Sequence, residues 1–467
     1  MDRIDLLDSG FLYLESPESP MHVAGLNVFE FPARVHQRKF MAEMREAYCS
    51  TTELRKPFAH RVAHGALGRF GPLYWEHEPD LDLDYHVRHS ALPKPGGDQE
   101  LFSLVSRLHS TLLDRSQPLW EAHLIEGIKG RRFGVYTKIH HAAIDGVAGV
   151  RLTEGGCSKD PMAPPGPSPL SLEAHEALKA RHNSGHAAKL EPSELDFKAM
   201  AEFLKAQFDT SAHLLGVIKS YAATWLGIGQ GLAVPWRHVP HTMINTEVSS
   251  SREFVAQSWS IDRVRAVSEA TGVTINDVVL AMCSGALRRF LEAQDELPEH
   301  SLRALVPVSV RQKDDFDSPL AISYIIADLG TRHADPVDRL VTITRSTRAG
   351  KEMLGELTSR EASLYATLMQ TPLFLASMMG VADWFPPVST VISNVPGPRE
   401  QLYWNGAPLL RSYPVSAVFH GFALNITFVS YHGNLDFGII ACRRTVPGVQ
   451  RLIDYLEQSL AELEALV

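Results

Sequence analysis

The chain has 467 residues, of which 45% are hydrophobic and 21% are charged, a balance typical of a folded globular protein rather than a disordered or fibrous one. This length exceeds the size at which one hydrophobic core keeps growing, so we expect two domains. The formal net charge of -9 argues against a nucleic-acid partner, because binding to a phosphate backbone relies on clustered lysine and arginine.

The cysteines and the N-terminus indicate the compartment. The cysteines lie far apart in the sequence, without the close pairs of a zinc site or a disulfide framework, so we expect reduced thiols at Cys49, Cys157, Cys283 and Cys442. The first five residues contain two acids and lack the basic segment and apolar core of a secretory signal. A cytoplasmic protein is the simplest interpretation.

Residues 1–160 are predicted to form a first domain that mixes helices and strands. Its clearest element is a hairpin, in which strands at residues 120–126 and 132–139 flank a glycine-containing turn at residues 127–130. The second of these strands leads directly to His140. The chemistry of the residues that follow it is therefore anchored to a regular element.

A linker is predicted at residues 161–245. It begins with five prolines between residues 161 and 169, a segment that cannot form a regular helix. From residue 197 to residue 225 apolar side chains recur every three to four positions, which predicts helices within the linker.

Residues 246–467 are predicted to form a second domain. Helices are expected at residues 264–271, closed by Gly272, and at residues 277–293, whose apolar side chains share one face. Strands are expected at residues 302–310, 391–395, 424–431 and 435–442, which are rich in Val, Ile, Phe and Tyr. The predicted fold class is therefore α/β or α+β, with a mixed sheet and helices in each half.

The segment His140-His141-Ala142-Ala143-Ile144-Asp145-Gly146 carries the strongest chemical signal. An imidazole accepts a proton at neutral pH, so a positioned histidine can act as the general base for a hydroxyl that attacks a thioester. A single histidine is more often an ordinary surface or core residue, however, and Asp145 could simply cap the next helix. The combination of these residues favours the catalytic interpretation.

Other chemistries have weaker support. The sequence contains no Gly-x-Ser-x-Gly elbow, which argues against a serine hydrolase of that type. Cys283 falls on the apolar face of a predicted helix, where burial makes a thiol unreactive. Adjacent histidines seldom bind the same ion, and His-Glu-x-x-His spacing is absent, so we expect no metal site.

The His-His segment resembles the HHxxxDG signature of the bacterial wax ester synthase/diacylglycerol acyltransferase family. Further motifs of that family are matched in the expected order by Pro118-Leu119-Trp120, by Asn276-Asp277, and by Ser393-Asn394-Val395-Pro396-Gly397-Pro398. The HHxxxDG signature alone is shared with condensation domains and other acyltransferases. The four motifs together span most of the chain and are similar only to the wax ester family.

The resemblance implies a role for each matching residue. His141 would be the general base, and His140 would support it. Asp145 would hold the shape of the loop through an ion pair, and Gly146 would allow a tight turn. Asn276 and Asp277 either cap a helix or, in the case of Asn276, orient the acyl carbonyl and stabilise its oxyanion; both interpretations stay open.

The resemblance also implies a fold and an activity. The fold would be that of two-domain CoA-dependent acyltransferases, a pseudo-dimer around a central channel. A long-chain acyl group would pass directly from acyl-CoA to a fatty alcohol, giving a wax ester, or to diacylglycerol, giving triacylglycerol, without a metal or cofactor. Two alternatives remain: a condensation-type enzyme that uses carrier-bound acyl groups, and a lipid-binding or droplet-coating protein that retains the fold.

One apolar segment is assigned to the lipid substrates. Residues 362–382 lack formal charges and approach the length of a spanning helix, but polar residues and a proline interrupt them, which favours a buried or membrane-surface helix pair. Side chains of this segment are expected to line an elongated acyl cavity, although core packing is the alternative for each of them: Leu368, Met369, Phe374 and Met378. Peripheral association with a membrane or lipid body is a further expectation.

Overall fold

The computed structural model describes residues 2–51, 53–65, 68, 71–182, 223–224, 232–309, 322–355, 357, 361, 365, 383–384 and 386–467. Two predictions therefore lie outside the described residues. These are the helices expected between residues 197 and 225, apart from residues 223–224, and the candidate cavity residues Leu368, Met369, Phe374 and Met378.

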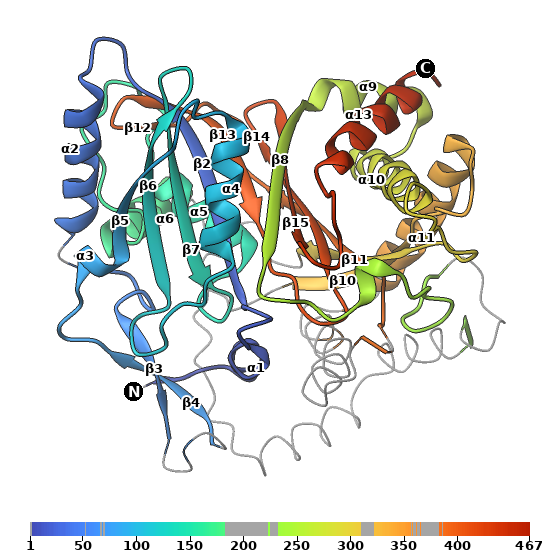
Figure 1. Ribbon diagram of the computed structural model, residues 1–467, viewed down its shortest axis with the longest axis horizontal. Coiled ribbons are helices and arrows are strands. Elements are labelled where there is room, and N and C mark those ends of the chain that lie inside the picture. Colours follow the sequence, from blue (N-terminus) through green and yellow to red (C-terminus); the bar gives the residue numbers. More distant parts are fainter. Residues whose placement is uncertain are drawn as a thin grey trace.

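The N-terminal half contains both strands and helices (Figure 1). The strands are β1 (Asp2–Arg3), β2 (His22–Glu30), β3 (His60–His64), β4 (Leu73–His77), β5 (Val87–Ala91), β6 (Trp120–Ile128) and β7 (Arg132–His140). The helices are α1 (Leu6–Leu14), α2 (Gln37–Cys49), α3 (Leu83–His86), α4 (Asp98–His109), α5 (Gly146–Gly155) and α6 (Leu172–His182).

The C-terminal half begins with a short 3₁₀ turn, η2 (Met243–Asn245). Its strands are β8 (Arg252–Ser260), β9 (Arg303–Ser309), β10 (Ile322–Asp328), β11 (Thr390–Pro396), β12 (Tyr403–Trp404), β13 (Ala407–Val415), β14 (Leu424–Tyr431) and β15 (Asn434–Cys442). Its helices are α9 (Ile261–Thr271), α10 (Ile275–Glu292), α11 (Pro336–Gly355) and α13 (Arg451–Glu464).

Each half is built on a six-stranded mixed sheet, and the two sheets lie side by side (Figure 1). The first sheet has the order β12-β13-β2-β7-β6-β5, and the second has the order β10-β9-β11-β14-β15-β8. A small sheet of order β1-β4-β3 lies beside the first. The mixed α/β fold expected from the sequence, with a sheet in each half, is confirmed.

The sequence did not predict that β12 and β13 belong to the first sheet. Their residues follow β11 of the second sheet, yet β13 pairs antiparallel with β2. Where β13 passes β15, the backbones are in contact, since a Cβ built at Gly438 would lie 1.7 Å from the carbonyl oxygen of Pro414. Only glycine fits there, so the two sheets are joined at this point by a close main-chain contact.

Helix α4 also joins the halves. Its apolar residues Leu101 and Val105 pack in a buried cluster together with Phe254 of β8. Two serines of α4 accept hydrogen bonds from the backbone N–H groups of the edge strand β8: Ser106 from Phe254 and Ser110 from Arg252, each at 2.9 Å. The helix therefore covers a sheet edge that would otherwise expose unpaired donors.

Most predicted elements are found within one or two residues of the expected bounds. The hairpin is confirmed as β6 and β7, with antiparallel pairing. Helix α9 ends as predicted at Gly272, which adopts a left-handed φ of 71°. Helix α10 starts two residues earlier than predicted, because Thr274 and Asp277 form a capping box.

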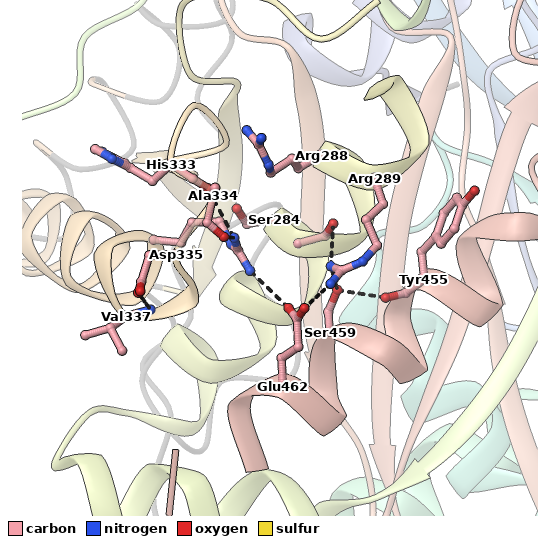
Figure 2. Close-up of polar contacts among 12 residues, drawn as sticks. Ser284, Arg288, Arg289, His333, Ala334, Asp335, Val337, Tyr455, Ser459 and Glu462 are labelled. Atoms are coloured by element: carbon pink, nitrogen blue, oxygen red, sulfur yellow. Dashed lines mark hydrogen bonds and ion pairs between the residues drawn. The ribbon is translucent and has the colours of Figure 1, made fainter. Parts of the chain in front are cut away.

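Polar contacts tie α10, α11 and α13 together on the outer side of the second sheet (Figure 2). Arg289 of α10 bonds to the Ser459 hydroxyl at 3.2 Å and pairs with Glu462 of α13. Arg339 of α11 is only 3% exposed and contacts the same carboxylate at 3.4 Å. The carboxylate of Glu462 thus balances the charges of Arg289 and Arg339. A buried guanidinium requires such a partner.

Candidate functional site

Strand β7 carries the two histidines to the junction of the halves. His140 is fully buried, and its backbone N–H donates to the carbonyl of Leu119 at 3.0 Å. Its Nδ1 accepts the Ala142 N–H at 3.1 Å, so in the neutral ring the proton is assigned to Nε2, which lies 3.4 Å from Glu15 Oε1. The side chain of His140 therefore faces the protein interior.

Glu15 connects both histidines to the segment after α1. Its Oε1 accepts the Met21 N–H at 3.2 Å, and its Oε2 accepts from Arg115 Nε at 3.1 Å. Burial raises the pKa of Glu15, but the hydrogen bond and charge of His140, together with Arg115, hold that pKa below its usual value. The carboxylate is thus kept ionised beside His140.

His141 is held by backbone and ring contacts. Its N–H donates to the Met21 carbonyl at 2.8 Å, and its ring stacks on Phe11 of α1 with centroids 4.2 Å apart. Nδ1 is buried and forms no hydrogen bond with another described residue. Burial lowers the pKa of His141; the backbone carbonyl of His141 and the Asp145 carboxylate oppose this shift, and His140 adds to it.

Asp145 and Gly146 begin helix α5. Asp145 is the N-cap, and its Oδ1 accepts the Ala148 N–H at 2.7 Å, as the capping interpretation expected. Gly146 is the first helical residue and does not adopt a left-handed conformation. A Cβ there would lie 3.3 Å from Val395 Cγ2, so glycine permits close packing of α5 against β11.

His141 lines a cavity of about 370 Å³ between the halves. The walls include the face of β2 and β7, one side of α5, and residues of β9, β10, β11, β13 and β14. Most of the surface is apolar. Three hydrogen-bonded polar side chains interrupt this apolar surface. Asn27 Nδ2 donates to Thr153 Oγ1 at 3.0 Å, and Asn27 Oδ1 accepts from the Ser412 hydroxyl at 2.9 Å. The cavity can therefore hold an elongated apolar ligand beside an imidazole.

The other sequence motifs lie at different distances from this cavity. Residues 393–396 line it. Neither Asn276 nor Asp277 is among the described residues that line it. Asp277 is 2% exposed, completes the cap with Thr274, and accepts from the Thr347 hydroxyl at 2.7 Å. These contacts support the structural interpretation of Asp277, while the role of Asn276 stays a prediction.

Two further motifs have structural explanations. Trp120 is buried, and its Nε1 donates to the Phe58 carbonyl at 2.8 Å, which fixes the start of β6 beside His140. Cys283 is fully buried in α10, and burial raises the pKa of its thiol to about 12. A thiol in that state is a poor nucleophile, as the sequence suggested.

Sequence reasoning missed the residues that contact the histidines from a distance in the chain. Phe11 and Glu15 lie about 130 positions before His141 and belong to no motif. Asn27 was missed because β2 was not predicted. An acid directly after an apolar N-terminal segment was the only available signal for Glu15, and it does not identify a partner.

Two family descriptions match the chain. The description "Wax ester synthase/diacylglycerol acyltransferase catalytic domain" matches residues 4–279, and "WS/DGAT C-terminal domain" matches residues 321–464. A solved wax ester synthase/diacylglycerol acyltransferase from Marinobacter aquaeolei VT8 is 36% identical, with a TM-score of 0.77, and covers 100% of this chain and 99% of its own. The two-sheet fold and the cavity lined by His141 are thus those of an acyltransferase.

Two sequence relatives agree. A protein of Mycobacterium tuberculosis named putative diacylglycerol O-acyltransferase is 42% identical over 99% of both chains. O-acyltransferase WSD of Acinetobacter baylyi is 38% identical over 99% of this chain and 96% of its own. The chain belongs to the wax ester synthase/diacylglycerol acyltransferase family, which confirms the resemblance of its motifs.

Among the described residues, no single helix is long and apolar enough to cross a bilayer. The successive helices α9 and α10 reach the required length and hydropathy only as a pair, meet at 106°, and α10 is largely buried in the core.

The contacts of Glu15 generate a first prediction. Glu15→Ala removes the acceptor for Met21 and the partner of His140, so His141 should shift and kcat should fall about ten- to a hundredfold. Glu15→Gln keeps an acceptor for Met21 and should retain more activity. Steady-state kinetics with circular dichroism as the folding control would check this; equal losses in the two variants would contradict it.

Proposed function

We propose that this protein is an O-acyltransferase that moves a long-chain acyl group from acyl-CoA to a fatty alcohol, to diacylglycerol, or to both. The observation that carries the proposal is the imidazole of His141 at the wall of an apolar cavity between two halves. Family membership supports the reaction class. The division into domains at residues 1–160 and 246–467, separated by a linker, is part of the same proposal.

In this mechanism His141 is the general base. Nδ1 is shielded from solvent, so the imidazole meets the hydroxyl through Nε2. The alcohol oxygen attacks the thioester carbon while Nε2 takes its proton, and a tetrahedral oxyanion forms. As the carbon–sulfur bond breaks, the same proton passes to the departing thiolate, which gives the ester and free CoA thiol without a covalent enzyme intermediate.

The neighbouring residues position this base. Phe11 covers one face of the ring, and the Met21 carbonyl fixes its backbone. His140 and Glu15 support the turn from inside, and Asp145 fixes the start of α5. Burial favours the neutral form of His141, and a general base must be neutral to accept a proton.

The apolar part of the cavity supports a long-chain substrate. Its lining includes residues of β2 and α5 and the buried side chains of Tyr48 and Trp404. Gly25 and Gly149 lie on opposite walls; a Cβ at Gly149 would meet nothing within 4 Å, and one at Gly25 only Asn27 Nδ2 at 4.0 Å. We assign this lobe, bounded by β2 and α5, to an aliphatic chain.

The two alternatives have less support. A condensation-type enzyme shares the HHxxxDG signature, but the family match covers both halves with wax ester synthase descriptions. A lipid-binding protein would explain the apolar cavity without explaining an imidazole in its wall that is held in place by Phe11 and the Met21 carbonyl. Release of CoA thiol from palmitoyl-CoA, dependent on added hexadecanol or diacylglycerol, separates the transferase from both.

Replacing the base tests the mechanism directly. His141→Ala and His141→Asn should lower kcat by about a hundredfold or more for either acceptor, because His141 is the only histidine among the described residues that line the cavity. His89→Ala, a partly exposed histidine of β5, serves as the matched control. A folded His141 variant with near-normal ester formation would refute the assignment.

The pH dependence of kcat follows from the same residue. Only neutral His141 accepts a proton, and its pKa lies below the usual value of 6.5, so the rate should be constant between about pH 7 and pH 8. On acidification it should fall as the imidazole becomes protonated, with a midpoint below 6.5. An acid limb centred above pH 7 would be inconsistent with this assignment.

Filling the lobe should change chain-length preference. Gly149→Leu places a side chain in open space, so the preference for palmitoyl over octanoyl substrates should fall about tenfold or more without loss of folding. Gly355→Leu on α11, also open within 4 Å but not among the cavity residues, is the control. An unchanged preference for palmitoyl over octanoyl substrates would mean that the acyl chain binds elsewhere.

Peripheral association with a lipid surface is a further part of the proposal, because both acceptors are insoluble in water. The protein should co-sediment with vesicles of phosphatidylcholine that contain diacylglycerol. Protein that stays in the supernatant at all lipid concentrations would argue against it.

A further inference from the structure

A group of basic side chains lies at one end of β9 and outside the catalytic cavity. It comprises Arg237 and His238 of the loop before η2, His300 before β9, and Arg303, the first residue of β9. His238 and His300 are exposed, and their rings are 4.9 Å apart. We call these four residues the cationic cluster.

The charges of the cationic cluster are poorly balanced. Among the described residues, Asp328 is the carboxylate at ion-pair distance, 3.5 Å from Arg303. Burial lowers the pKa of Arg303, Asp328 opposes this, and Arg237 lowers it further. Burial and the charges of His300, Arg237 and Arg303 lower the pKa of His238. The cations therefore repel one another, and a bound anion would relieve the repulsion.

The backbone around Arg237 is also unusual. Trp236 and His238 have φ values of 59° and 54°, in the left-handed region that non-glycine residues rarely adopt. The turn is held from outside, since the Trp236 N–H donates to the Pro387 carbonyl at 3.0 Å. Arg237 itself bonds to the Thr224 carbonyl through one nitrogen of its guanidinium. The backbone is therefore strained on both sides of Arg237.

The cationic cluster is adjacent to the cavity wall. Leu305, Pro307 and Tyr324 line the cavity from β9 and β10. Side chains alternate along a strand, so Arg303 and its pairing partner Asp328 follow on the same face, two residues beyond Leu305. Leu305 packs against a buried apolar cluster: Ala233, Ile326, Val388 and Phe422.

The substrate requires a cationic site outside the cavity. CoA carries a pyrophosphate and a 3′-phosphate at one end of its pantetheine arm, and the described residues that line the cavity include neither lysine nor arginine. We propose that the cationic cluster binds the phosphate groups of acyl-CoA, while the thioester reaches His141 along the wall formed by β9. This inference rests on the proposed function, because it presumes that acyl-CoA is the donor.

The test compares two acyl donors that differ in their phosphates. Palmitoyl-CoA carries them, and the palmitoyl thioester of N-acetylcysteamine does not. In Arg237→Gln, Arg303→Gln and the double variant, the ratio of kcat/KM for palmitoyl-CoA to that for the small thioester should fall about tenfold or more, through KM. Arg237→Lys should recover part of the ratio. Arg348→Gln, an exposed arginine of α11, makes the same change in net charge and should leave the ratio unchanged.

Arg303 pairs with Asp328, so Arg303→Gln also removes an ion pair that stabilises the fold; Arg237→Gln and His300→Gln, for which the described residues contain no ion-pair partner, keep the test decisive. Calorimetric titration with adenosine 3′,5′-bisphosphate, which requires no turnover, should show weaker binding in the same variants. Equal effects on both donors, or unchanged nucleotide affinity, would overturn the proposal. Loss of binding to phosphatidylglycerol vesicles with an unchanged donor ratio would assign the cluster to lipid phosphate and overturn it as well.

The same experiment separates failure of this inference from failure of the proposed function. A wild-type protein that forms no ester from either donor would refute the function, while the nucleotide titration would still measure the cluster. A wild-type protein that forms ester and whose ratio does not respond to Arg237→Gln would refute the cluster alone.

Discussion

The fold depends on one constraint: strand β13 is taken from the C-terminal half and paired with β2 of the N-terminal half. The cavity exists because this crossing holds the two sheets at a fixed separation. At Gly438 the backbones of the two sheets meet, because a Cβ there would lie 1.7 Å from the Pro414 carbonyl oxygen. Residues 414–417, which follow directly, line the cavity. The connection that joins the sheets is therefore also part of the binding site.

The second layer of organisation is electrostatic. The side of β7 opposite the cavity carries His140, fully buried, and Lys138, which pairs with Glu121. Such groups are costly to remove from water, and each is matched here by carbonyls or by an opposite charge, as when Lys138 donates to the Leu108 and Thr111 carbonyls at 2.9 and 2.8 Å. The ion pair and carbonyl contacts of Lys138 fix the polar interior behind β7 and resist repacking. The strand that carries His141 consequently presents a rigid edge to the cavity.

The sequence predicted the elements whose signals are local. Local signals specify structure over a few residues: the glycines between β6 and β7, Gly272 after α9, and the Val, Ile, Phe and Tyr residues of β14 and β15. It also indicated where the proposed base lies, since the His-His segment follows a clear strand and His141 lines the cavity. What it could not predict are contacts between distant segments: Glu15 with His140, Phe11 with His141, and β13 with β2. These depend on tertiary packing, which leaves no periodicity in the chain. Asn276 shows the reverse limit, because a motif that is recognisable in sequence lies outside the described wall of the cavity.

The crossing of β13 into the first sheet has a consequence for folding during synthesis on the ribosome. Strand β2 acquires its outer neighbour only after residue 415 has been synthesised, so the first sheet stays incomplete while nearly all of the chain is being made. Until then the backbone groups along one side of β2 are open to other chains, an edge that favours aggregation. A fragment that stops before β12 would keep that edge permanently. The first sheet is thus completed only when a strand of the C-terminal half is present, which couples the folding of the two halves.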